Sequence, residues 1–217
     1  MPAPDPQALE RAAAAVRRVV ANIRKTQAPT ELLAEAEQQL DALSEKLAAY
    51  DHPGPYAQGA LVAGDIGEIP DGFVPSEFFP YSPVVGASNP VAPPIYFENR
   101  DGELFAEHAF DAQYCGPLTG VHGGVIAMVL DELLGSVNVV NDVGGFTGTL
   151  SIKYHSLTPV GLDKPIRMRA WVDRREGRKT FSKGTFHFGN RLCAEAEGVF
   201  IMPNDDTFER MRDEVSE

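Results

Sequence analysis

The sequence predicts an α+β fold in which an antiparallel sheet wraps around a long central helix, with a helical hairpin ahead of the sheet. Apolar residues recur at three- and four-residue spacing in residues 7–50, and an apolar stretch follows the glycine pair at 123–124, as expected of helices. Further along, Ile166, Met168 and Ala170 alternate with charged residues, which is the period of half-buried strands. A one-sided apolar sheet and a long apolar helix bury each other most simply when the sheet wraps around the helix.

Residues 1–50 form the predicted helical hairpin. The turn Gln27-Ala28-Pro29 separates two helices, and each helix has its own apolar seam. We expect the hairpin to pack on the core or on a second subunit. The seams comprise Leu9, Ala12, Val16, Val19, Val20 and Ile23 in the first helix and Leu33, Ala36, Leu40, Leu43, Leu47 and Tyr50 in the second.

Residues 51–94 are predicted to be an extended, irregular connection, because they contain nine prolines and six glycines without a sustained period. Aromatic residues such as Phe78 and Phe79 indicate that the connection lies against a surface. Residues 95–203 form the predicted main domain, and 204–217 form a C-terminal tail.

Six strands are expected within the main domain. The dipeptides Glu176-Gly177 and Gly189-Asn190 are typical of hairpin turns, so the last three strands should be antiparallel neighbours. The expected strands cover residues 95–99 and 104–110 before the central helix, and 146–156, 166–174, 179–188 and 192–202 after it.

Charge and cysteine usage exclude several classes of function. The net charge of −12 disfavours nucleic acid as a partner. The two cysteines and five histidines show no metal-ligand spacing, so we expect no metal. No apolar run is long enough to span a bilayer, and the first residues do not resemble a signal peptide, so we expect a cytoplasmic protein with no membrane partner.

Candidate chemistry is concentrated between residues 116 and 131. His122 precedes Gly123 and Gly124 at the start of the central helix, where free backbone N–H groups and the helix dipole favour negative charge. A thioester carbonyl held there would have its developing oxyanion stabilised. Asp131, about two turns later, could activate water as a general base or attack directly as a nucleophile.

The stretch VHGGVIAMVLDELLG resembles the signature of the PaaI-like branch of hotdog-fold acyl-CoA thioesterases. In that family an acidic residue follows the histidine of the HGG motif by nine positions, as Asp131 follows His122. The resemblance covers roughly residues 95–203. It implies hydrolysis of an acyl-CoA to free acid and CoA without a cofactor, with Gly123 N–H and His122 polarising the carbonyl and Gly124 beside them.

The same resemblance extends to the strand after the helix, where the family has a Ser or Thr seven residues before a Tyr. Thr147 and Tyr154 match, and the family places this hydroxyl in the neighbouring subunit's site, which implies a homodimer or higher oligomer. Thr149 should lie on the same face of the strand as Thr147. The family often has Asn six residues before the His, whereas this sequence has Gly116.

Nine basic residues fall between positions 160 and 191 against three acidic ones. They are candidates for holding the CoA phosphates, and the alternative is a solubilising outer sheet face. Two other functions are weighed against hydrolysis. A hotdog module that binds acyl-CoA without cleaving it would not need Asp131. A hydratase or dehydratase ranks last, because its Asp-x-x-x-x-His arrangement is absent beside the central helix.

Overall fold

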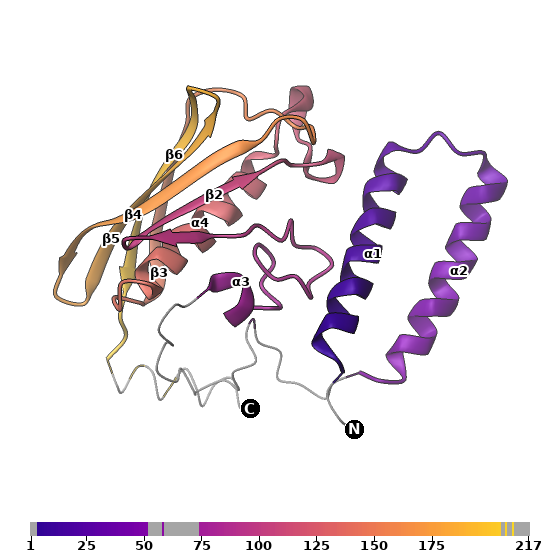
Figure 1. Ribbon diagram of the computed structural model, residues 1–217, viewed down its shortest axis with the longest axis horizontal. Helices are drawn as coiled ribbons and strands as arrows, with labels where there is room; N and C mark the ends of the chain where they lie inside the picture. Colours follow the sequence, from indigo (N-terminus) through magenta and orange to yellow (C-terminus); the bar gives the residue numbers. More distant parts are fainter. Residues whose placement is uncertain (1–3, 52–57, 59–73, 205–206, 208–209, 211–217) are drawn as a thin grey trace.

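The computed structural model describes residues 4–51, 58, 74–204, 207 and 210, and it shows one six-stranded antiparallel sheet curved around a single long helix (Figure 1). The helices are α1 (Pro6–Lys25), α2 (Thr30–Ala48), α3 (Pro75–Phe78) and α4 (Gly123–Val139), with two short 3₁₀ turns, η1 (Ala112–Tyr114) and η2 (Pro117–Thr119). The strands are β1 (Glu98–Arg100), β2 (Glu103–His108), β3 (Phe146–Tyr154), β4 (Ile166–Glu176), β5 (Lys179–Phe188) and β6 (Arg191–Ile201).

The strand order is β1-β2-β4-β5-β6-β3, and every neighbouring pair is antiparallel. The expected neighbours β4, β5 and β6 are confirmed. Turn dipeptides predict pairing only between strands that are consecutive in the sequence. They therefore could not predict the partner of β3, which follows α4 in the sequence but pairs with β6 at the edge of the sheet. Within the described residues, β3 is paired along one of its long edges, with β6.

Helix α4 forms the centre of the core. Its apolar residues cover more than one face, so the helix is surrounded by the sheet on one side and by the segment before β1 on the other. Gly184 and Gly198 let β5 and β6 approach the helix closely, because a Cβ at either position would lie within 3 Å of Leu134. The buried residues of α4 include Val129, Leu130, Leu133, Leu134 and Val137.

The connection before β1 contributes directly to this core. Val84 and Val85 are fully buried in the same apolar cluster as α4 and the sheet. Ile95 and Phe97 are buried as well, although the strand expected at 95–99 is observed only from Glu98 to Arg100. Their burial comes from packing against the core and not from membership of the sheet. The boundary placed at residue 95 stays a prediction.

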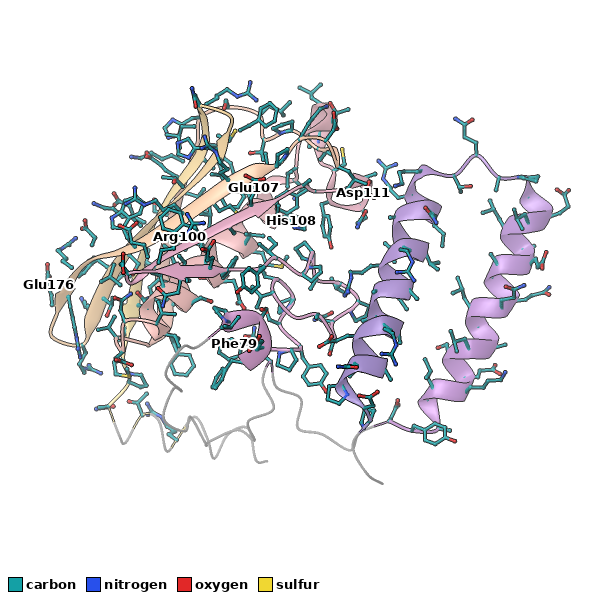
Figure 2. The ribbon with its side chains drawn as sticks, in the orientation of Figure 1. Phe79, Arg100, Glu107, His108, Asp111 and Glu176 are labelled. Carbon is teal, nitrogen blue, oxygen red and sulfur yellow. The ribbon has the colours of Figure 1, made fainter. Side chains whose placement is uncertain are left out.

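Helix α1 is attached to the domain by one face. Ala13 and Ala21 are buried, and the Arg17 guanidinium between them donates hydrogen bonds to the carbonyls of Ala87 (3.1 Å) and Asn89 (2.7 Å). At the end of the helix, Lys25 pairs with Asp111 at 2.9 Å, and Figure 2 shows Asp111 beside this end of α1. The predicted packing of the hairpin on the core therefore holds for α1.

Helix α2 stands outside the domain and buries none of its side chains (Figure 1). Both predicted helices are observed, but their apolar seams remain exposed in the single chain. None of the helices in the described part of the chain is both long and apolar enough to cross a membrane. The exposed seam residues include Val16, Val20 and Ile23 in α1 and Leu33, Leu40, Leu43 and Leu47 in α2.

Candidate active site

A tight loop brings His122 to the start of α4. Gly116 N–H donates to the Gly120 carbonyl at 2.7 Å, and His122 N–H donates to the Tyr114 carbonyl at 2.9 Å. A Cβ on Gly116 would lie 2.8 Å from His122 Cα, so no side chain fits at this position without displacing the turn. In this chain the turn therefore requires glycine at position 116, a close approach that the sequence did not show.

The first turn of α4 leaves one backbone donor free. The Nδ1 atom of His122 accepts a hydrogen bond from Gly124 N–H at 3.0 Å, and the His122 carbonyl accepts from Val125 N–H at 2.9 Å. Within the described residues, Gly123 N–H has no acceptor. This donor sits at the positive end of the helix dipole and is half-buried, which suits it to stabilising a developing oxyanion.

The bond from Gly124 also fixes the tautomer of the His122 ring. A backbone N–H can only donate, so Nδ1 must be unprotonated, and the neutral imidazole carries its proton on Nε2. The ring is exposed. Its Nε2–H is thus left as a second donor at the start of α4, which fits a role in polarising a carbonyl.

Asp131 lies on the same helix and is half-buried. Its Oδ1 accepts a hydrogen bond from the Thr147 hydroxyl at 2.9 Å, and Thr147 belongs to β3 of the same chain. Within the single chain the two side chains lie together, and the second carboxylate oxygen of Asp131 is left for another partner. The assignment of Thr147 to a site of the neighbouring subunit stays a prediction.

Asp131 and Gly123 are far apart within one chain. They are separated by eight residues of continuous helix, which at about 1.5 Å per residue places their backbones about 12 Å apart along the axis. A general base activates a water that attacks the carbonyl carbon of the substrate, while the oxyanion donor holds the oxygen on that same carbon. The Asp131 carboxylate and the Gly123 N–H must therefore lie within a few ångströms of one carbonyl group if they act together. The chain therefore carries two candidate half-sites, the turn at Gly123 and the Asp131–Thr147 pair, which do not meet within one chain.

The prediction that Thr149 shares the face of Thr147 is wrong. A bulge at Gly148 shifts the register between β3 and β6, so Thr147 pairs with Phe200 but Thr149 pairs with Val199. Phe200 faces the core, and beyond the bulge Leu150 and Ile152 also pack against the core. One extra residue reverses the alternation of side chains. Thr149 therefore lies on the outer face of the sheet, away from Asp131.

A buried contact next to Asp131 was not recognised in the sequence. Ser82 is fully buried, and its hydroxyl donates to the Glu132 carboxylate at 2.6 Å while accepting from Val84 N–H and Val85 N–H. Burial raises the pKa of Glu132, the Ser82 hydrogen bond lowers it, and the Asp131 charge raises it. Glu132 thus ties the segment before β1 to α4, and no periodicity in that segment pointed to Ser82.

Tyr154 is a second residue whose contact the sequence did not show. Its hydroxyl donates a hydrogen bond to the Gly123 carbonyl at 2.8 Å. In the sequence, Tyr154 served only to locate Thr147, which precedes it by seven residues in the family motif. Because β3 runs back along α4, its two ends reach the two half-sites, with Thr147 at Asp131 and Tyr154 at Gly123.

Several of the basic residues expected to hold phosphates are engaged on the outer sheet face. Arg169 forms a bidentate pair with Glu103 at 2.7 and 2.8 Å, and Asp173 pairs with both Arg174 and Lys183 at 3.1 Å. These contacts favour the solubilising alternative for those three cations. In the described residues, no cluster of three or more His, Cys, Asp or Glu side chains is arranged to hold a metal ion.

Comparison with solved structures identifies the architecture. A thioesterase superfamily protein of known structure is 27% identical and superimposes with a TM-score of 0.76, covering 89% of this chain and 94% of that one. The chain has the hotdog fold of the thioesterase superfamily. The 89% coverage extends into the N-terminal helices, because residues 51–217 alone would amount to less than that share.

Two further structures resemble only about half of the chain. Mouse thioesterase superfamily member 2 is 17% identical over 50% of this chain and 82% of its own, with a TM-score of 0.47. A putative thioesterase from Ralstonia eutropha, related to phenylacetic acid degradation, is 18% identical over 50% of this chain and 84% of its own, with a TM-score of 0.43. No family model and no curated protein matches the sequence.

Proposed function

We propose that this protein hydrolyses acyl-CoA thioesters to a free acid and CoA. The observation that carries the proposal is the unpaired Gly123 N–H at the start of α4, combined with a Thr147-oriented carboxylate at Asp131. The first group suits the oxyanion of a tetrahedral intermediate, and the second suits activation of water. The 27% identical thioesterase superfamily structure supports the same class of reaction.

The proposed reaction uses only these side chains, backbone groups and water. Asp131 removes a proton from water, and the resulting hydroxide attacks the thioester carbonyl carbon while Gly123 N–H and His122 Nε2–H hold the oxyanion. The C–S bond then breaks, and the CoA thiolate takes the proton back from Asp131. Direct attack by Asp131 is the alternative, and single-turnover hydrolysis in ¹⁸O-labelled water would place the label in Asp131 only by that route.

The complete site is shared between two subunits in this proposal. The turn at residues 122–124, which carries the free Gly123 N–H and is called the oxyanion turn below, faces the Asp131–Thr147 pair of the other chain in this proposal. One chain alone cannot bring them together, because Gly123 and Asp131 are about 12 Å apart along its α4. A two-fold axis relating the chains would generate two equal sites per dimer. Thr147 holds one carboxylate oxygen at 2.9 Å and leaves the other oxygen to bind water.

A hydrolysis assay on a panel of acyl-CoA substrates tests the proposal, comparing the wild type with Asp131→Asn. The amide keeps an oxygen for the Thr147 hydroxyl but cannot take a proton, so the rate should fall about 10²–10⁴-fold. Asp142→Asn is the matched control, because Asp142 is exposed beyond the end of α4 and its positive φ of 55° suits Asn.

Three other results would each contradict one part of the proposal. A folded wild type that hydrolyses no member of the panel but binds CoA would replace hydrolysis with the acyl-CoA-binding alternative. Full activity in Asp131→Asn would remove Asp131 from the mechanism. A rate loss in Asp142→Asn equal to that in Asp131→Asn would show that the effect is general to charge removal near α4.

A further inference from the structure

The peptide group between Gly123 and Gly124 is held at both ends. Its carbonyl accepts a hydrogen bond from the Tyr154 hydroxyl at 2.8 Å, and its N–H donates to His122 Nδ1 at 3.0 Å. Because two partners on opposite sides fix the plane of this peptide, it cannot rotate without losing one of them. The preceding peptide, which carries the free Gly123 N–H, is held through its own carbonyl, that of His122, which accepts from Val125 N–H and Ile126 N–H, so each of the two successive peptides has its own hydrogen bonds.

We propose that Tyr154 is a positioning residue that aims the Gly123 N–H at the oxyanion, acting with His122 as the second support. Tyr154 does not touch the reacting atoms in this proposal, which rests on the proposed thioester hydrolysis. Its side chain reaches the turn from the end of β3, an element separate from the loop and helix that form the turn. The oxyanion turn therefore depends on the sheet for its orientation.

Two features favour positioning over simple packing. Tyr154 is 53% exposed, so it contributes little to the core, whereas its hydroxyl makes a specific bond of ordinary length. A glycine at position 123 has no side chain to limit its backbone torsions, so the relative orientation of the two peptides that flank it depends on the hydrogen bonds that each peptide makes. The first helical turn alone gives only the bonds to the His122 carbonyl and ring.

The division of roles has a chemical consequence for His122. Its Nδ1 is occupied by Gly124 N–H, so the ring supports the turn through one nitrogen and offers a donor through the other. A doubly protonated ring could not accept from Gly124 N–H. One ring thus couples the orientation of the turn to its ability to donate to a substrate.

Tyr154→Phe tests the proposal, because it removes the hydroxyl and keeps the ring. With the acyl-CoA that the wild type hydrolyses fastest, kcat should fall on the order of tenfold, less than the 10²–10³-fold loss of an oxyanion donor itself. KM should change by less than about twofold, since the contact acts on the transition state. Tyr96→Phe is the control, because Tyr96 is similarly exposed at 59% and has no hydrogen bond in the described structure.

Amide NMR spectra give a second readout that does not depend on activity. In Tyr154→Phe the Gly123 and Gly124 amide resonances should shift, and in the wild type the His122 ring ¹⁵N spectrum should show the proton on Nε2. If Tyr154→Phe folds poorly, Tyr154→Leu serves as the second variant, because its side chain has no hydrogen-bond donor.

Each outcome decides between the two proposals. An unchanged kcat in folded Tyr154→Phe, or a lower kcat with unmoved Gly123 and Gly124 resonances, would overturn the positioning role and leave the proposed hydrolysis standing. If the wild type hydrolyses no substrate, the proposed function fails, and shifted glycine resonances would still establish that Tyr154 holds the peptide.

Discussion

The sharing of a site between two subunits can be tested by combining two inactive variants. Gly123→Pro removes the free N–H of the oxyanion turn and is compatible with the backbone at the start of α4. Proline is well tolerated at the first position of a helix, and His122 already has the extended backbone, with φ −60° and ψ 135°, that precedes proline favourably. Asp131→Asn removes the carboxylate of the other half-site. Each variant alone should lose about 10²-fold or more in rate.

The expected recovery follows from the 12 Å separation along α4. In a mixed dimer, one site combines the intact turn of one subunit with the intact Asp131 of the other, while the second site has lost both groups. A mixed dimer purified through two different affinity tags should therefore have about half of the wild-type activity, and a random equal mixture of chains about a quarter. Both values stand far above the activity of either variant alone.

The assay is acyl-CoA hydrolysis by tandem-purified mixed dimers, with each variant's own homodimer measured in parallel. Gly123→Ala is the control for the turn, because it keeps the N–H and places its Cβ in ordinary contact, 3.6 Å from the Tyr154 ring. Mixed dimers as inactive as the two parents would refute the shared site. They would require Gly123 and Asp131 of one chain to act together despite the length of helix between them.

Two further predictions concern Gly116 in the loop and the half-buried His108. Gly116→Ala should lower the free energy of unfolding by about 1–3 kcal/mol and reduce kcat, because its Cβ would lie 2.8 Å from His122 Cα. Urea unfolding measures the first effect and the hydrolysis assay measures the second. A variant equal to the wild type in both would contradict the steric argument. Burial lowers the pKa of His108 from 6.5 to about 4, so the unfolded chain binds a proton that the folded one does not, and the wild type should lose up to about 3 kcal/mol of stability as the pH falls from 6.5 to 4. His108, which Figure 2 shows on β2 beside Glu107, packs edge-on against Phe110 at 5.0 Å; His108→Leu should lose less stability over this pH range in urea titrations, and equal slopes for the two proteins would exclude His108 as the cause.

Patterns confined to neighbouring residues were predictable from the sequence. The helix from Gly123 to Val139 follows from an apolar run that begins at a glycine pair and a capping histidine. The strands β4, β5 and β6 follow from alternation and from turn dipeptides, both of which act over a few residues. The two N-terminal helices follow from their seams in the same way.

Contacts between distant segments were not predictable in this way. A single bulge at Gly148 turned Thr149 outward, and bulges leave no unambiguous mark in a sequence. The Ser82 hydroxyl reaches Glu132 across 50 residues, and Ser82 lies in a segment that has no periodicity to assign. The basic residues between positions 160 and 191 are visible in the sequence. Their ion-pair partners are not, because these depend on which strands lie side by side.

The sequence by itself determined the elements and the chemical groups of the candidate site, because a helix start with two glycines and a carboxylate two turns later are local features. Only the tertiary structure decided how those groups are distributed. It paired Thr147 with Asp131, placed Tyr154 at Gly123 and kept the two pairs apart, because β3 runs back along a rigid helix whose length fixes their separation.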